Sequence, residues 1–225
     1  MSPDLDRLAR SLNIVLSDQG LLEQALTHRS ASRRHSYERL EFLGDACLSM
    51  VISEFLYERF PDASEGDLTR MRAMLVKGQT LARLGQQLGL GEYLRLGPGE
   101  MKSGGHRRDS ILADAVEAIL GAVYLDGGLE PARAFVLRHW ADNLEAISPA
   151  QASKDAKTRL QEQLQSRQAP LPAYEVAEIS GQAPNEVFTV VCELADGTVF
   201  SASGSSRRKA EQKAAQQALT WLEDQ

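Results

Sequence analysis

The chain has 225 residues, of which 43% are hydrophobic and 25% are charged, which is the composition of an ordinary globular protein. Lys and Arg number 25 against 31 Asp and Glu, so the formal net charge is −6 at pH 7. No apolar run reaches the length of a membrane span and the N-terminus has no apolar signal core, so we expect a cytoplasmic protein with no membrane partner. Cys47 and Cys192 lie far apart and are too few for a metal cluster, which favours a reducing compartment.

Residues 1–148 show helical periodicity without the alternation that is typical of strands, and they predict an all-α domain. Leu5, Leu8, Leu12 and Val15 recur at helical spacing, and residues 21–26 suggest a short second helix. Further helices are expected over residues 37–60 and 108–125, and another begins near residue 131. Between residues 65 and 88, a helical pattern starts at residue 65 and its leucines continue to residue 88. Pro61 ends the long helix, Ser64 and Asp67 resemble a capping box for the next one, and residues 97–105 form a glycine-bearing loop.

The sequence changes character after residue 148. Residues 149–154 form a short polar linker, and residues 155–225 form a second, smaller domain. A helix is predicted over 157–166, strands over 174–179, 187–194 and 198–202, and a final helix over 206–222, with Asp196-Gly197 as a hairpin turn. The order α-β-β-β-α indicates an α+β domain after the all-α domain.

Five acidic residues stand out in the first domain. Glu38, Glu41 and Asp45 are spaced i, i+3 and i+7, which places them within an arc of about 60° on one helix. Asp114 and Glu117 are spaced i and i+3 in a helix that is otherwise almost wholly apolar. Buried carboxylates are costly unless they are compensated, and Mg²⁺ prefers oxygen ligands. The five acids therefore predict a magnesium site.

These acids have two alternative interpretations. Paired acids commonly form a solvated helix face, and a di-iron carboxylate bundle is the second alternative. The di-iron site requires Glu-x-x-His pairs, and none of the four histidines has Glu three residues earlier, so Mg²⁺ or Mn²⁺ is favoured. No GxxxxGK[ST], HExxH or GxSxG motif occurs, and we expect no small-molecule cofactor. His28 and Cys47 are interpreted as structural residues.

A basic cluster opens the last predicted helix. Its members are Arg207, Arg208, Lys209 and Lys213. Cations at a helix N-terminus oppose the helix dipole, whereas the free N–H groups there can bind phosphate. Because residues 149–225 hold 8 basic and 10 acidic side chains, any contact with a polyanion has to come from such a local cluster. An ordinary charged surface helix is the alternative.

Two sets of motifs resemble known families. ERLEFLGDA at 38–46, with ALTHRS at 25–30 and ILADAVEAILGAVYLD at 111–126, resembles the nuclease domain of the ribonuclease III family. KTRLQEQLQ at 157–165 and GSSRRKAEQKAAQQAL at 204–219 resemble a double-stranded-RNA-binding domain. The resemblance implies a homodimeric endoribonuclease that uses Mg²⁺, with Mn²⁺ as a substitute, to cleave double-stranded RNA to 5′-phosphate and 3′-hydroxyl ends. It also implies a role in processing ribosomal RNA precursors and in messenger RNA processing and decay.

The same resemblance assigns roles to residues by position. The implied metal ligands are Glu41, Asp45, Asp114 and Glu117. The implied catalytic residues are Asp45 and Glu117, with Glu38 and Glu65 in supporting roles. Phe42 corresponds to an aromatic side chain that inserts into the partner subunit, although burial within its own domain is an alternative. The implied RNA contacts are Thr158, Gln161, Glu162, Gln165, Ser205, Ser206, Arg207, Arg208, Lys209 and Lys213.

Three positions depart from the family pattern. Tyr37 stands where Asn is common, Pro184 replaces a His that enters the minor groove, and Ala202 replaces a frequent Gly. Tyr37 is expected to alter packing beside the acids while leaving every ligand in place, and Pro184 is expected to weaken one RNA contact. Two other functions compete with the nuclease: a non-catalytic RNA-binding protein, which would lose acids, and a phosphohydrolase of small substrates, which would not need the RNA-binding domain.

Overall fold

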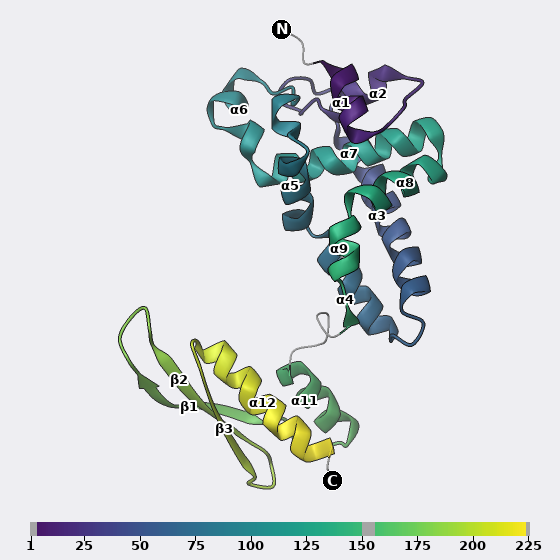
Figure 1. Ribbon diagram of the computed structural model, residues 1–225. Coiled ribbons are helices and arrows are strands. Elements are labelled where there is room, and N and C mark those ends of the chain that lie inside the picture. The colour runs from purple at the N-terminus through teal and green to yellow at the C-terminus, as the bar shows by residue number, and fades with distance from the viewer. Residues whose placement is uncertain (1–3, 150–155, 224–225) are drawn as a thin grey trace. The chain divides into compact units, whose positions relative to one another are not determined.

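The computed structural model describes residues 4–149 and 156–223. Contacts divide the chain into two units, Met1–Ala152 and Ser153–Gln225 (Figure 1). Apart from Pro149, the predicted linker 149–154 lies outside the described residues. None of the described helices combines the length and the hydropathy that a membrane span requires.

The described part of the first unit is helical, which confirms the all-α prediction. Its helices are α1 (Leu5–Leu12), α2 (Gln19–Ala25), α3 (Glu38–Arg59), α4 (Glu65–Val76), α5 (Gly78–Gln87), α6 (Pro98–Lys102), α7 (Asp109–Gly127), α8 (Leu129–His139) and α9 (Ala141–Ala146), with 3-10 turns η1 (Leu90–Glu92) and η2 (Gly105–Arg107). Ser64 caps α4 as predicted, since its side chain accepts a hydrogen bond from the N–H of Asp67. Cys47 is buried in the core, and burial raises the pKa of its thiol, as suits a structural residue.

Some predicted boundaries are wrong. α1 ends at Leu12 because Asn13 takes the left-handed conformation (φ 53°), and Val15, expected on the same helix face, lies beyond the helix and is 95% exposed. The predicted loop 97–105 contains α6, which starts with Pro98 at a position where proline is well tolerated. The helix expected from residue 131 begins at Leu129 and is followed by α9.

The centre of this unit is the crossing of α3 and α7. α7 is buried along most of its length, and α3 packs directly on it. The two backbones meet at Gly44 and Gly121: a Cβ atom on Gly44 would overlap the carbonyl oxygen of Glu117, and one on Gly121 would overlap that of Leu40. Only glycine permits this approach at both positions. The crossing therefore brings the acids on either side of Gly44 next to those of α7.

The second unit has the predicted order α-β-β-β-α. Its elements are α11 (Ala156–Ser166), β1 (Ala173–Ser180), β2 (Val187–Glu193), β3 (Val199–Gly204) and α12 (Arg207–Glu223). The antiparallel sheet has the order β1-β2-β3, and both helices cover one of its faces (Figure 1). The core between sheet and helices includes Leu160, Cys192 and Leu219. Gly197 takes a positive φ of 83° in the β2–β3 hairpin, where a turn was expected.

Candidate functional site

Three carboxylates from the two crossing helices converge: Glu41 of α3 and Asp114 and Glu117 of α7. One oxygen of each lies within 4.8 Å of the others, and all three side chains are partly buried. Opposite ligands of an octahedral Mg²⁺ are about 4.2 Å apart, so small side-chain movements would let one cation contact all three. The donor set consists only of oxygen atoms, which suits Mg²⁺ or Mn²⁺.

The electrostatics of this cluster show uncompensated negative charge. Burial, followed by the charges of Asp45, Glu41 and Asp114, raises the pKa of Glu117 to about 8. Burial, with the charges of Asp114, Glu38 and Asp45, raises the pKa of Glu41 to about 7 against the opposing effect of Arg29. A divalent cation would remove both the repulsion and the cost of burial. The residues present therefore fit a metal.

The other two acids of this end of α3 lie at the edge of the cluster. Asp45 is exposed, and its charge raises the pKa of Glu41 and Glu117, yet it falls outside the group of three converging oxygens. Glu38 accepts hydrogen bonds from Arg29 Nη1 (3.3 Å) and Ser36 Oγ (3.2 Å). Metal ligation by Asp45 and a supporting role for Glu38 stay predictions.

Glu65, the remaining predicted catalytic acid, lies elsewhere in the unit. It begins α4, accepts a hydrogen bond from Thr69 Oγ1 (2.8 Å), and lines a pocket of about 500 Å³ together with Met50 and Tyr57. These two residues lie about 13–24 Å further along α3 than Glu41, at 1.5 Å of rise per residue. Within one chain, Glu65 is therefore separate from the converging carboxylates.

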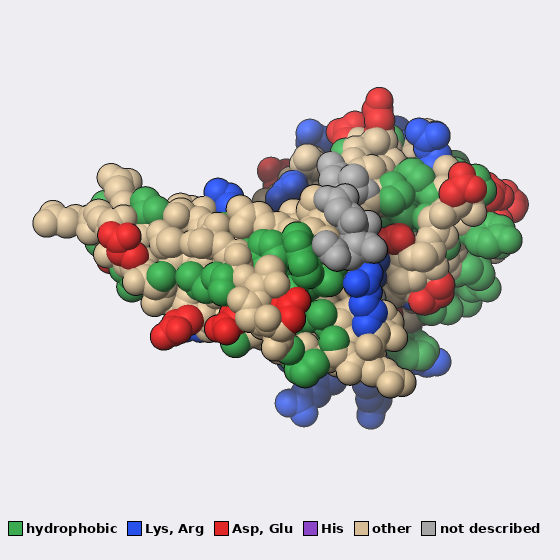
Figure 2. Space-filling model, turned by 90° about the horizontal axis from the view of Figure 1, so that it is seen from below, with side chains coloured by type: hydrophobic (Ala, Val, Ile, Leu, Met, Phe, Trp, Pro, Cys, Tyr) green, Lys and Arg blue, Asp and Glu red, His purple; other side chains and the backbone are tan. Residues whose placement is uncertain are grey.

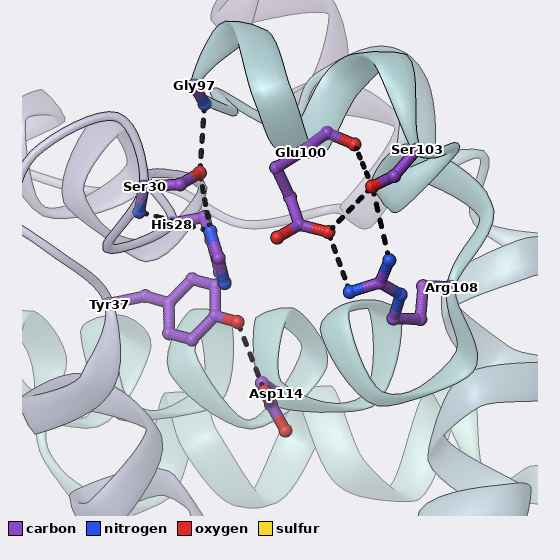
Figure 3. A network of polar contacts seen from close by, with 8 residues as sticks. All are labelled: His28, Ser30, Tyr37, Gly97, Glu100, Ser103, Arg108 and Asp114. Carbon is purple, nitrogen blue, oxygen red and sulfur yellow. Dashed lines mark hydrogen bonds and ion pairs between the residues drawn. The ribbon is translucent and has the colours of Figure 1, made fainter.

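Tyr37 adjoins the cluster in a way that the sequence did not reveal. Its side chain is 3% exposed, and its hydroxyl donates a hydrogen bond to Asp114 Oδ2 at 3.1 Å (Figure 3). Burial and the charge of Asp114 raise the pKa of Tyr37. His28 lies beside it, with ring centroids 5.7 Å apart, and His28 Nδ1 accepts a hydrogen bond from the N–H of Ser30 (3.1 Å). His28 is thus buried and hydrogen-bonded, as interpreted from the sequence.

A pocket of about 640 Å³ opens beside these acids. Its lining includes the acids Glu41 and Asp114 and the basic residues Arg29, Arg33 and Arg108. Arg108 is paired with Glu100 at 2.6 Å and also donates to Ser103 Oγ (Figure 3). The pocket therefore offers carboxylates to a cation and guanidinium groups to a phosphate in the same cavity.

In the second unit, the predicted basic cluster lies at the start of α12. Ser206 Oγ accepts a hydrogen bond from the N–H of Lys209 (3.3 Å) and so caps the start of the helix. Lys209 Nζ donates to Ser205 Oγ (3.1 Å) and Lys213 Nζ donates to the carbonyl of Ser203 (3.0 Å). These bonds hold two of the cationic groups near the end of β3. The cluster is exposed to solvent.

The polar residues predicted on α11 share one face of the helix. Thr158, Gln161, Glu162 and Gln165 occupy it, whereas Leu160 and Leu164 are buried against the sheet and α12. Pro184 lies in the exposed β1–β2 loop after a cis peptide bond, and Ala202 packs against the core. The RNA contacts assigned to these residues stay predictions.

Acidic side chains gather on the other face of the sheet. Glu175, Glu178 and Glu193 are exposed, and the strand register places them opposite the face that carries Cys192 and the helices. Figure 2 shows acidic side chains among hydrophobic and uncharged ones over the strands. The second unit has more acidic than basic residues, yet the acids on the sheet lie on a different surface from its basic cluster.

Comparisons with known proteins agree with both units. Residues 18–144 match the ribonuclease-III-like family, and residues 156–222 match the double-stranded RNA binding motif. The chain belongs to the ribonuclease III family. Ribonuclease 3 of Alcanivorax borkumensis is 60% identical over 226 residues, covering 100% of this chain and 99% of that protein. Ribonuclease 3 of Vibrio cholerae is 57% identical over 223 residues, covering 99% of each.

Solved structures support the same assignment for the first unit. A crystal structure of the nuclease domain of ribonuclease III from Campylobacter jejuni matches with a TM-score of 0.62 and 40% identity, over 65% of this chain and 99% of that one. A second structure of that domain matches with a TM-score of 0.61 and 41% identity, over 62% of this chain and 98% of that one. That structure shows flexibility in a region of the Campylobacter domain that is involved in dimer formation. As a ribonuclease III, this chain is an endoribonuclease of a metal-dependent family with a double-stranded-RNA-binding domain, which favours the nuclease over both competing functions.

Proposed function

We propose that this ribonuclease III is a homodimer that cleaves double-stranded RNA with Mg²⁺, or with Mn²⁺ as a substitute, and leaves 5′-phosphate and 3′-hydroxyl ends. The observation that carries the proposal is the convergence of Glu41, Asp114 and Glu117, with raised pKa values at Glu41 and Glu117, in a chain that also has a double-stranded RNA binding motif. Asp45 completes the ligand set from the exposed edge of the cluster.

The chain's residues hold the cation and the phosphate. Glu41, Asp45, Asp114 and Glu117 would hold a divalent cation, which would lower the pKa of a water and neutralise charge on the scissile phosphate. Glu117 and Glu41 take up protons near neutral pH when no cation is present, so protons and the cation compete for the same oxygens. Glu38 accepts hydrogen bonds from Arg29 and Ser36, which orient its carboxylate in a supporting role at the edge of the cluster. Arg29, Arg33 and Arg108 offer positive charge to phosphates beside the scissile one.

The second unit binds the duplex. The polar face of α11, with Thr158, Gln161, Glu162 and Gln165, suits the 2′-hydroxyls of a minor groove, while the basic start of α12 and its serines suit phosphates across the adjacent major groove. Such a domain spans about 16 base pairs and recognises the A-form shape with little dependence on sequence. Duplex segments of ribosomal RNA precursors and of messenger RNAs in the cytoplasm are the substrates that the family implies.

The exposed stripe of α3 supports the homodimer. Phe42 is 79% exposed and Tyr57 75% exposed, and with Met50 they lie along one side of the helix. Phe42 of the partner subunit would fit the pocket of Met50, Tyr57 and Glu65. Because Phe42 adjoins Glu41 in the sequence, this pairing would bring Glu65 to the acids of the other subunit. Glu65 would then support catalysis in the active site of the partner subunit. Within its own chain, Glu65 lies too far from the converging carboxylates to do so.

The test is cleavage of a long RNA duplex with Mg²⁺, with Mn²⁺ and with EDTA. The wild-type protein should cut only with metal, and Glu117→Gln should abolish cutting while duplex binding persists. Glu130→Gln, an exposed acid at the start of α8, is the matched control and should cut normally. Cutting in EDTA, or turnover by Glu117→Gln equal to that of the control, would overturn the assignment.

A further inference from the structure

Tyr37 connects the two helices that carry the converging carboxylates. Its backbone carbonyl accepts the N–H of Glu41 (2.9 Å) and thereby starts α3. Its side chain reaches α7, where the hydroxyl donates to Asp114 Oδ2 (3.1 Å; Figure 3). Its own N–H donates to the carbonyl of Thr27 (2.9 Å) and anchors the residue to the segment before α3. One residue thus contacts the backbone of one proposed ligand and the side chain of another.

The position of Tyr37 is unusual for its residue type. It is the N-cap of α3, where Ser, Thr, Asp or Asn would satisfy a free backbone N–H, and its side chain makes no capping hydrogen bond. α1, α2 and α4 are capped by the side chains of Asp4, Asp18 and Ser64, whereas α5 to α9 resemble α3 in having no side-chain cap. α3 therefore lacks a side-chain cap that is typically worth about 1 kcal/mol. The side chain at this position is instead used for the contact with Asp114.

We propose that Tyr37 is a positioning residue of the metal site, whose hydroxyl holds the Asp114 carboxylate in the orientation in which it converges with Glu41 and Glu117. This inference rests on the proposed function in one respect, that the three acids hold a divalent cation. A carboxylate has two oxygens with several acceptor sites, so the hydrogen bond to Oδ2 leaves capacity for a cation. Tyr37 is buried, so water does not readily replace the hydroxyl as a donor.

Removing the hydroxyl should weaken metal binding without separating the helices. Hydrogen-bond partners of metal ligands fix the orientation of the ligand, and their loss typically lowers metal affinity about 10- to 100-fold. The contact of α3 with α7 at Gly44 and Gly121 does not involve the phenol group, so the helix crossing persists in Tyr37→Phe. The expected defect is therefore in the cation affinity rather than in the fold.

The experiment measures Mn²⁺ binding to the full-length protein without RNA, from the electron paramagnetic resonance signal of free Mn²⁺. Tyr37→Phe should bind Mn²⁺ about tenfold more weakly than wild type. Tyr124→Phe removes a hydroxyl from α7 away from the cluster and should bind as wild type does. Thermal unfolding of each variant checks that the protein is folded.

Cleavage of duplex RNA gives an independent readout. In Tyr37→Phe the Mg²⁺ concentration for half-maximal rate should rise by a similar factor, while the KM for RNA at saturating Mg²⁺ stays unchanged. An Mn²⁺ affinity of Tyr37→Phe equal to that of wild type overturns the inference even if wild type cleaves RNA normally. Failure of the wild-type protein to cleave duplex RNA overturns the proposed function instead, so the two failures are distinguishable.

Discussion

Gly44 of α3 and Gly121 of α7 face each other, so that a Cβ atom on Gly44 would lie 3.0 Å from the backbone nitrogen of Gly121 and one on Gly121 would lie 3.1 Å from that of Gly44. Glu41 and Asp45 lie one turn or less from the first glycine, and Glu117 lies one turn before the second. The separation of the carboxylates is therefore set by the contact between two backbones. A side chain at this contact would move the acids apart.

Gly44→Ala should destabilise the nuclease unit and reduce cleavage strongly. The added methyl group meets backbone atoms that cannot rotate away, and overpacking of this kind costs about 1–3 kcal/mol. Gly78→Ala at the start of α5 is the matched control, since nothing lies within 4 Å of the position its methyl group would take and alanine favours a helix. Urea unfolding measures the stability of both variants. Equal stability of Gly44→Ala and Gly78→Ala would contradict the close packing of α3 on α7.

Glu41 and Glu117 should make the metal-free protein less stable as the pH rises. The pKa values of Glu117 and Glu41 are raised to about 8 and about 7 from an ordinary value of 4.5. Between the ordinary and the raised pKa of each group, the folded state therefore binds more protons than the unfolded state. Their contribution to the free energy of unfolding is complete below about pH 4.5 and is lost as the pH rises through about 7 to 8. The decline should be on the order of 2 kcal/mol after allowance for solvent screening. Urea unfolding in EDTA across this range measures it.

Saturating Mg²⁺ should remove most of this decline, because the cation compensates the deprotonated carboxylates. Glu117→Gln should be more stable than wild type at about pH 8 without metal, since the substitution removes an uncompensated charge while keeping a side chain of similar size. Parallel pH profiles for wild type and Glu117→Gln would show that Glu117 does not carry the effect.

Phe42→Ala should shift the protein from dimer to monomer. Truncation of an exposed aromatic anchor at an interface commonly costs 2 kcal/mol or more, equivalent to about 30-fold in the dissociation constant. Val15→Ala truncates an apolar side chain outside α3 that is even more exposed than Phe42, and should leave the oligomeric state unchanged. Sedimentation velocity over a dilution series distinguishes the two. A Phe42→Ala protein that stays dimeric at every wild-type dimer concentration would refute the role of this side chain.

Lys209→Gln should weaken duplex binding and reduce its dependence on salt. Loss of one phosphate contact lowers the slope of log affinity against log salt concentration by about 1. Arg167 lies outside α12 but donates a hydrogen bond to the carbonyl of Leu222, near the end of that helix opposite to the basic cluster. Arg167→Gln makes the same change of charge there and should leave the slope of log affinity against log salt concentration unchanged. Measurement in a Glu117→Gln background prevents cleavage during titration. Equal slopes for both variants would place the phosphate contacts elsewhere.

The sequence predicts the features that depend on local spacing. Acids at i, i+3 and i+7 had to share one face of α3, and the apolar surroundings of Asp114 and Glu117 indicated burial, as the structure confirms for α7. The second unit was equally predictable, because short strand-like runs and the Asp196-Gly197 turn are local signals. The boundary error at α1 arose where a single residue, Asn13, changes the backbone conformation and ends the helix.

The features that depend on contacts between distant segments were not predictable. Gly44 and Gly121 are ordinary helix residues in the sequence, and only their contact gives them a role. Tyr37 was noted as a departure from the family, but its bond to Asp114 spans 77 positions. The separation of Glu65 from the other acids likewise requires the path of α3 to be known.

The arrangement of charge in the second unit gives it an electric dipole. Glu175, Glu178 and Glu193 point away from the outer face of the sheet, whereas α12 begins on the opposite side with Arg207, Arg208 and Lys209, of which Arg207 is paired with Glu211. In the field of a polyanion this dipole experiences a torque that turns the cationic end forward before any contact forms. Approach by the sheet is repelled, so encounters in the wrong orientation are short-lived. An excess of acids over bases in a nucleic-acid-binding unit can thus select orientation at little cost in attraction.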